Sequence, residues 1–361
     1  MKVKQFQWID SLKGIAVLGV ISVHCLGIVL PKGESSVTNL TKGMEYFFNY
    51  GQLGVQLFFM ASAITLFLST INRKEPSWKF FFIRRFFRIW PLYCCGIILY
   101  VTLNSISEDP QKISSTDILL NVLLANGLSE SANNSVVPGG WSIGTEVIFY
   151  CLFPILFKTL NNKTLLSLFT SAAFLILTCL AIEVIGGFKP DVNVFYYRLI
   201  INQLSVFIIG ACTFRLLGKK IGVTTTFIGI ALIVVSCYLF NQGYKPAFNL
   251  FFIPILACTG FSILIIKFQD SCNKSQSFIW RYLAKLGKVS YSAYLLHFAV
   301  IWFLAPAIRP HMDKIHSQDF SLIFVTVIVT IATFLVASIS YRWIEKPAIR
   351  LGEAFIERLK N

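Results

Sequence analysis

Residues Ser11–Cys25 read SLKGIAVLGVISVHC, an apolar run with a lysine near its start and a histidine near its end. Apolar runs of about 18 residues or more recur along the whole chain, and such runs are typical of transmembrane helices. The composition agrees, because 55% of the residues are hydrophobic and only 14% are charged, whereas a soluble chain has about 25% charged residues. The runs are uninterrupted rather than alternating, which favours helices over a barrel. We therefore predict an all-α polytopic membrane protein.

The predicted spans are distributed over the full length of the chain. We place about ten, at residues 12–30, 51–70, 90–105, 141–160, 165–186, 197–216, 225–241, 249–267, 288–306 and 321–341. With a cytoplasmic N-terminus, 24 of the 32 Lys and Arg residues fall inside and 8 fall outside. Cytoplasmic loops of membrane proteins carry this excess. We therefore predict two cytoplasmic termini, and we assign the net charge of +15 to membrane orientation rather than to nucleic-acid binding.

The sequence has no fixed-period repeat and no low-complexity tract. We therefore predict a single transmembrane domain over residues 1–361, with a short cytoplasmic tail at 343–361 and no fused soluble domain. The nine cysteines contain no C-x-x-C pattern, so neither a zinc site nor a redox pair is indicated. The short apolar segment Thr116–Leu128 is interpreted as re-entrant or interfacial, because a span there would break the charge asymmetry.

The first predicted helix carries ionisable residues along one stripe. Lys13 and His24 are eleven residues apart, which corresponds to three turns plus about 20°. Asp10, three residues before Lys13, falls near the same stripe. His24 then lies about 16 Å from Lys13 along the axis, about half the thickness of the hydrocarbon core. An ionisable residue at that depth faces a bundle interior or a wet cavity. The alternative is that His24 bonds a neighbouring helix while Lys13 and Asp10 are interface anchors.

A basic, aromatic-rich segment, WKFFFIRRFFRIWPLY, covers Trp78–Tyr93. A helix would bring Arg84, Arg85 and Arg88 together, because they are three and four residues apart. Arginine side chains suit bidentate phosphate binding. The alternative is a positive-inside anchor with snorkelling side chains. We expect Pro91 to open the next helix, where its missing N–H is harmless.

The segment PGGWSIGTEVIFYCLFP begins at Pro138 with a turn that leads into a helix. Ser142, Glu146 and Tyr150 follow at intervals of four and lie on one face. Glu146 falls in the first two turns, where the helix dipole favours a carboxylate. It is interpreted either as a structural carboxylate at the water interface or as a group that lines the same cavity as His24.

Two later segments repeat the pattern of polar residues on one helix face. In LGKVSYSAYLLH, Ser290, Tyr294 and His297 share a face, and interhelical hydrogen bonds alone would explain them. In SYRWIEKP, Glu345 is interpreted as mainly structural, and Pro347 is expected to end the helix.

These segments together resemble the acyltransferase family 3 membrane proteins, polytopic enzymes that acylate, most often acetylate, sugars of bacterial surface polysaccharides and glycoconjugates. The first helix is similar to the family's D-x-x-[RK]-G-I-A…H pattern, with Lys13 and His24 at its polar positions. Residues 49–64 resemble G-x-x-G-V-x-x-F-F-x-x-S-G, which includes Ser62, and the arginine segment resembles R-R-x-x-R-I-x-P. The segment from Trp141 resembles W-S-L-x-x-E-x-x-F-Y-x-x-x-P, and the SYSAYLLH and IEKP ends also fit.

The chain departs from the family pattern at two positions. Lys13 stands where arginine is commoner, which keeps the charge and loses the planar fork. Ala63 replaces the glycine that follows Ser62 in the family. No extracytoplasmic esterase-like domain is expected, although some relatives have one.

The resemblance implies a multi-pass O-acyltransferase of the cell (inner) membrane. Its donor would be cytosolic acyl-CoA, most often acetyl-CoA, and its acceptor a sugar hydroxyl of a surface polysaccharide or a lipid-linked glycan. Membrane lipids are the only other partners expected. No nucleic acid, metal or permanently bound cofactor is expected. His24 would be the general base, or form a covalent acyl intermediate, because neutral histidine can take a proton near pH 7.

The other residues receive roles from the same resemblance. Glu146 would orient His24 or a substrate hydroxyl, and Asp10 would pair with Lys13. The expected donor-binding residues are Lys13, Arg84, Arg85 and Arg88, and the expected supporting residues are Asp10, Ser62, Trp141, Ser142, Tyr150, Tyr294 and His297. The rival hypothesis is a multi-span transporter or flippase, which would also place His and Glu inside the membrane.

Overall fold

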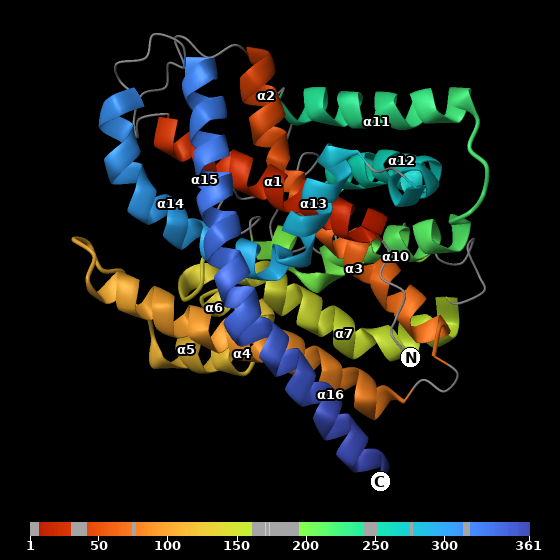
Figure 1. Cartoon of the computed structure of the whole chain (residues 1–361), viewed down its shortest axis with the longest axis horizontal. Helices are drawn as coiled ribbons and strands as arrows, with labels where there is room; N and C mark the ends of the chain where they lie inside the picture. Colours follow the sequence, from red (N-terminus) through yellow and green to blue (C-terminus); the bar gives the residue numbers. More distant parts are fainter. Residues whose placement is uncertain are drawn as a thin grey trace.

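The structure, a computed structural model, describes residues 7–29, 42–73, 77–160, 170, 173, 195–241, 251–274, 277–312 and 318–361. These residues form helices and turns, and no strand occurs among them (Figure 1). The elements are α1 (Gln7–Val29), α2 (Lys42–Tyr50), η1 (Gly51–Leu53), α3 (Gly54–Ile71), α4 (Trp78–Ser105), α5 (Ser115–Val122), η2 (Asn126–Leu128), α6 (Ala132–Ser135), α7 (Gly140–Leu160), α10 (Ile200–Leu216), α11 (Val223–Asn241), α12 (Ile253–Lys274), α13 (Phe278–Lys288), α14 (Ser290–Met312), α15 (Gln318–Ser340), the π-helical turn η4 (Tyr341–Glu345) and α16 (Lys346–Lys360).

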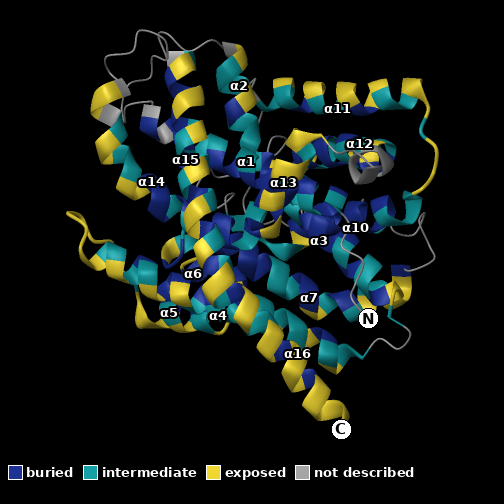
Figure 2. Cartoon of the chain, in the orientation of Figure 1, coloured by how far each residue is buried: buried dark blue, intermediate teal, exposed yellow. Residues whose placement is uncertain are grey.

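Eight helical stretches in the described ranges are long and apolar enough to cross a membrane, and a shorter apolar helix covers Ile253–Gln269. Helix α11 exposes large apolar side chains such as Phe227 and Val234 (Figure 2), as expected of a surface that contacts lipid. The prediction of an all-α, multi-pass membrane protein is confirmed. The predicted span 165–186 lies almost wholly outside the described residues. The total of about ten spans and the side of each terminus stay predictions.

Helix α1 is the central element of the bundle and contacts α3, α12, α13, α14 and α15 (Figure 1). Its closest approach is to α13. A Cβ atom at Gly14 would clash with the carbonyl of Leu283, and one at Gly287 would clash with the carbonyl of Asp10. Small residues allow two membrane helices to pack backbone against backbone. The Gly14 and Gly287 contacts therefore fix α13 beside the Asp10–Lys13 turn of α1.

Helix α4 includes the arginine segment and the following apolar run in one continuous helix. It begins at Trp78 because the Ser77 side chain caps its N-terminus by accepting a hydrogen bond from the Phe80 amide. Pro91 lies inside this helix, so the prediction that it opens a helix is wrong. Membrane helices tolerate an internal proline better than soluble ones. The Tyr291 hydroxyl donates to the carbonyl of Ile89 in the same turn, which ties α14 to this part of α4.

The chain also continues through the expected stop at Pro347. The π-helical turn η4 joins α15 to α16, and the two helices follow one another across the bundle (Figure 1). Pro347 lies in the first turn of α16, directly after the π-helical turn, so the prediction that it ends a helix is wrong. The predicted tail at 343–361 is mostly helical and packs on α4 through Gly352 and Phe87.

The segment expected to be re-entrant or interfacial forms the short helices α5 and η2. Eight residues of helix are about 12 Å long, far less than the hydrocarbon thickness, so α5 does not cross the membrane. Tyr93 of α4 donates to Asn121 over 2.7 Å, which ties α5 to α4. A Cβ at Gly127 would lie 2.9 Å from Gly144, and one at Gly144 would lie 2.6 Å from Gly127. This glycine contact fixes the height of the α7 face that carries Glu146.

Candidate functional site

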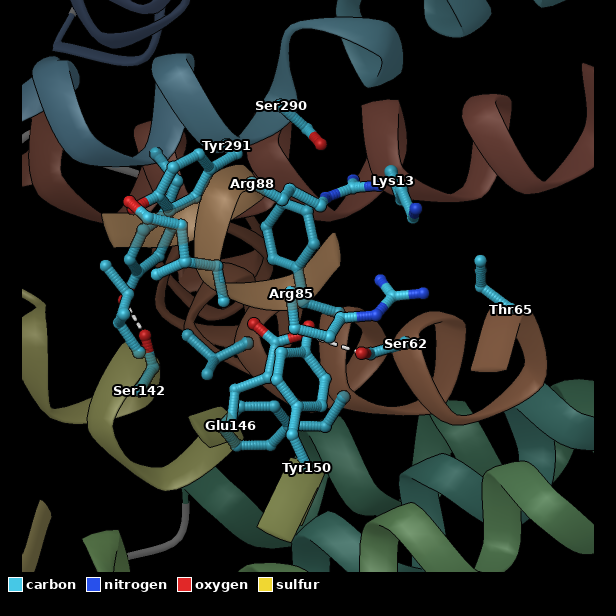
Figure 3. A pocket seen from close by; sticks show the side chains of 16 residues that line it. Lys13, Ser62, Thr65, Arg85, Arg88, Ser142, Glu146, Tyr150, Ser290 and Tyr291 are labelled. Atoms are coloured by element: carbon cyan, nitrogen blue, oxygen red, sulfur yellow. Dashed lines mark hydrogen bonds between the residues drawn. The ribbon is translucent and has the colours of Figure 1, made fainter. Parts of the chain in front are cut away.

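A cavity of about 80 Å³, called here the inner cavity, lies where α1, α3, α4, α7 and α14 meet (Figure 3). Its wall is partly apolar and partly charged, which is unusual for the interior of a membrane bundle. The lining residues are Lys13, Val55, Phe58, Phe59, Ser62, Thr65, Arg85, Arg88, Ile89, Ser142, Ile143, Glu146, Tyr150, Ser290, Tyr291 and Tyr294.

Glu146 is the carboxylate of the inner cavity. Ser62 of α3 donates to its Oε1 over 2.5 Å, and Tyr150, one turn further along α7, donates to the same oxygen over 2.6 Å. Ser142, Glu146 and Tyr150 all line the cavity, so the prediction that they share one helix face is confirmed. The two hydroxyls hold the carboxylate in one orientation, which is what a group that positions a substrate requires.

Three cations surround Glu146. Lys13 comes from α1, whereas Arg85 and Arg88 come from successive turns of α4, and all three project into the space that contains Glu146 (Figure 3). The Arg85 guanidinium lies over the Tyr150 ring, 5.5 Å from its centre. The charge of Glu146 attracts Lys13, whereas the charges of Arg85 and Arg88 repel it. Among its lining residues the inner cavity thus has more positive than negative charge, which suits an anionic or strongly polarised substrate group.

Arg84 does not join these cations. It forms an ion pair with Glu353 of α16 over 3.6 Å. It lines a separate, smaller cavity with Arg73 and Arg85. Arg84 therefore does not line the inner cavity with Arg85 and Arg88, because α16 packs on the face of α4 that carries it. The donor-binding role expected for the three arginines stays a prediction.

A second cavity of about 310 Å³, called here the outer cavity, adjoins the inner one. The two share Lys13, Thr65 and Arg88, which therefore stand at the boundary between them. The outer cavity adds Asp10, Lys288, Tyr341 and Glu345 to its polar wall. Asp10 and Lys13 both line this wall, so the prediction that they lie on one stripe of the first helix is confirmed. Their pairing stays a prediction.

His24 does not line the inner cavity. Its ring packs against His297 at 5.3 Å and against Phe298 at 4.3 Å between ring centres. His297 in turn lies 5.7 Å from the ring of Tyr294, which does line the cavity. A layer of rings thus connects the cavity to His24. The expected shared cavity and direct pairing of His24 with Glu146 are not seen, because Ser62 and Tyr150 hold the Glu146 carboxylate instead.

His297 is completely buried. Its Nδ1 lies 2.5 Å from the carbonyl oxygen of Tyr294, and a carbonyl only accepts, so Nδ1–H is the donor. Its Nε2 is buried and has no hydrogen-bond partner in the described part of the chain. Neutral His297 therefore presents an acceptor nitrogen within the layer of rings that contains His24.

The remaining predicted residues support the start of α7. The hydroxyl of Tyr294 lies 2.8 Å from that of Ser142 and donates to the carbonyl of Gly139, which has a φ of +76°. A positive φ favours glycine, so the turn before α7 depends on Gly139. Trp141 is buried outside the inner cavity, and Arg198 lies over its ring at 5.9 Å.

Comparisons with known proteins agree with this architecture. Residues 6–342 match the family model described as the acyltransferase domain. The chain belongs to the acyltransferase family. This confirms the resemblance inferred from the ordered motifs, and it places the chain among the acyltransferase enzymes.

Curated relatives of this acyltransferase are distant but match along almost its whole length. It is 24% identical to the O-acetyltransferase OatA of Staphylococcus aureus over 98% of the chain and 59% of the relative. It is 25% identical to the peptidoglycan O-acetyltransferase OatA of Listeria monocytogenes over 98% of the chain and 57% of the relative. The chain thus spans less than three fifths of the length of these relatives. No solved structure matches the chain.

Two residues that line the outer cavity were not anticipated as cavity residues. Glu345, interpreted from the sequence as structural, is only 3% exposed, lines the outer cavity and accepts a hydrogen bond from Ser292 over 2.9 Å. Lys288 lines the same cavity but was counted only as a positive-inside residue. The π-helical turn that aims Glu345 inward has no simple sequence signature, although such turns often occur at functional sites.

Proposed function

We propose that the chain is a membrane O-acyltransferase that moves an acyl group, in the simplest case acetyl, from cytosolic acyl-CoA to a sugar hydroxyl. The acceptor is a surface polysaccharide or a lipid-linked glycan. The observation that carries this proposal is the inner cavity, in which Lys13, Arg85 and Arg88 surround the doubly hydrogen-bonded Glu146. The names of the relatives, O-acetyltransferase and peptidoglycan O-acetyltransferase, support the acetyl group and the glycan.

In the proposed reaction the acceptor hydroxyl attacks the thioester carbonyl of the donor. A new C–O bond forms, the C–S bond breaks, the general base takes the hydroxyl proton, and the thiolate of CoA leaves and is protonated. The cations at the inner cavity stabilise the negative charge that develops on the carbonyl oxygen. Glu146 orients the acceptor hydroxyl. His24 is the proposed base. It is reached only when the rings of both Tyr294 and His297 move aside, because His297 lies between Tyr294 and His24.

The donor is a substrate that binds and leaves, and not a resident cofactor. In our proposal the protein lies in the cell (inner) membrane. There a donor from the cytosol and an acceptor that is membrane-bound or external can meet at one site. Membrane lipids surround the bundle. Mass spectrometry of surface glycans from cells with and without the chain tests the proposal, and identical ester content in both would contradict it.

Arg88→Ala should raise the KM for acetyl-CoA about tenfold, because hydrogen bonds to charged groups contribute about 1.5–3 kcal/mol. Arg88 lines both cavities, so its loss removes a cation from the boundary that the donor must pass. Initial rates at varied acetyl-CoA concentrations measure the effect.

Arg84→Ala is the matched control for this prediction. Arg84 comes from the same helix, but it pairs with Glu353 and lines neither cavity. We expect the KM of the Arg84→Ala protein for acetyl-CoA to stay within about twofold of the wild-type value. Equal effects of the two substitutions would contradict the assignment of Arg88 to the donor path.

A further inference from the structure

We propose that Arg281, Lys285 and Lys288 on α13 form the binding site for the phosphate-bearing end of the donor. From this site the acyl-carrying arm runs through the outer cavity to Glu146. The proposal rests on the proposed function, because it takes an acyl-CoA as the donor. It names the residues that recognise the nucleotide, a role that the sequence pattern had given to the arginines of α4.

The three cations occupy one face of α13. They are spaced at i, i+4 and i+7, so the helix carries them in one row. All three are exposed, and α13 contains no acidic residue. The row does not depend on a flexible loop, since the Gly14 and Gly287 contacts fix α13 against α1.

These cations line a third cavity of about 280 Å³, called here the surface cavity, together with Gln7, Asp10 and Ala284. The surface cavity shares Asp10 and Lys288 with the outer cavity. The outer cavity shares Lys13, Thr65 and Arg88 with the inner cavity. The three cavities therefore adjoin in series, from the exposed face of α13 to Glu146.

The charge of the series fits this donor. Six cationic side chains line the three cavities against three carboxylates, those of Asp10, Glu146 and Glu345. The cations of α13 form the outermost group, and phosphates bind where several such side chains converge. The alternative position on α4 is less suitable, because the Arg84 guanidinium is paired with Glu353.

A membrane-anchoring role would explain the cations less completely. The exposed apolar residues of α13, Phe278, Ile279 and Tyr282, suit contact with lipid. The cations, by contrast, line a cavity that leads into the protein. Lipid headgroup phosphates nevertheless share the chemistry of donor phosphates, so the test must separate these two sources.

The test compares the double variant Arg281→Gln/Lys285→Gln with the control Lys219→Gln/Lys220→Gln. Both lose two positive charges, and the control residues are exposed in the turn after α10, away from the cavities. Acetyl transfer is measured in nanodiscs with acetyl-CoA and with S-acetylpantetheine, which has the arm without the phosphates. Binding of radiolabelled CoA is measured separately. Each assay is run in zwitterionic and in anionic phospholipid.

We expect the α13 variant to raise the KM for acetyl-CoA and the Kd for CoA about tenfold or more, with kcat nearly unchanged. The effect should be the same in both lipids, the KM for S-acetylpantetheine should not move, and the control should change less than about twofold. An unchanged KM, an equal shift in the control, or a shift confined to anionic lipid would overturn the α13 site alone. Failure of the wild-type chain to bind CoA would overturn the proposed donor as well.

Discussion

Replacing His24 with alanine should lower the rate of acetyl transfer about 100-fold or more, because general-base catalysis contributes about 10²–10⁴-fold. His24 is the histidine of α1, eleven residues beyond Lys13. Its ring contacts His297, which in turn contacts Tyr294 at the cavity wall. The measurement is kcat with acetyl-CoA in purified protein, at equal amounts of correctly inserted enzyme. Because no charge at the donor path changes, the KM for acetyl-CoA should stay near the wild-type value.

The matched control is His311→Ala. His311 is an exposed histidine at the end of α14 and lies outside the three cavities. It should leave kcat unchanged. If His24→Ala retained near-normal transfer in protein that folds and inserts, His24 would be a packing residue and not the base.

Glu146→Gln should abolish measurable transfer and lower thermal stability. Gln keeps the shape of the side chain but removes the negative charge that faces Lys13, Arg85 and Arg88. Without this charge the three partly buried cations of the cavity repel one another without compensation, so the protein should unfold at a lower temperature. Thermal unfolding in detergent and acetyl transfer at a temperature below the transition measure the two effects separately.

Ser62→Ala and Tyr150→Phe serve as graded controls for Glu146. Each removes one hydrogen bond to Oε1 and leaves the charge in place. Each substitution should remove a hydrogen bond that contributes about 1.5–3 kcal/mol to holding the carboxylate in its orientation. The two together should lower kcat less than Glu146→Gln does. A fully active and stable Glu146→Gln protein would show that the carboxylate has no part in catalysis.

Residues whose position depends on helical periodicity were predicted well. The shared face of Ser142, Glu146 and Tyr150, and that of Asp10 and Lys13, need only a spacing of three or four residues within one helix. The all-α membrane class follows from the apolar runs in the same direct way. These features are local, so the sequence pattern alone determines them.

The errors arose where contacts between helices decide the outcome. Pro91 and Pro347 were expected to mark helix ends, but the Ser77 cap and the π-helical turn set those ends instead. Arg84 was grouped with Arg88, yet the packing of α16 pairs it with Glu353. Whether two residues on different helices share a cavity, as Glu146 and His24 do not, depends on packing that no single segment encodes.

The close contact of α1 with α13 brings charged residues of both helices together. Asp10, Lys13 and Lys288 belong to segments far apart in the sequence, and the Gly14 and Gly287 contacts bring them to one cavity wall. The proposed donor path therefore depends on the same backbone contact that holds α13 against α1. Structure and proposed function are linked at this point of the fold.

Transfer of labelled acetyl groups by the purified chain in sealed proteoliposomes tests the central claim most directly. Acetyl-CoA labelled in the acetyl group is supplied on one side, and glycan acceptor on the other or in the membrane. The account predicts label in a stable ester on the glycan, with CoA released and with transfer by the His24→Ala protein lower by about 100-fold or more. Passage of unmodified substrate across the membrane without any esterified glycan would contradict it and would identify a transporter.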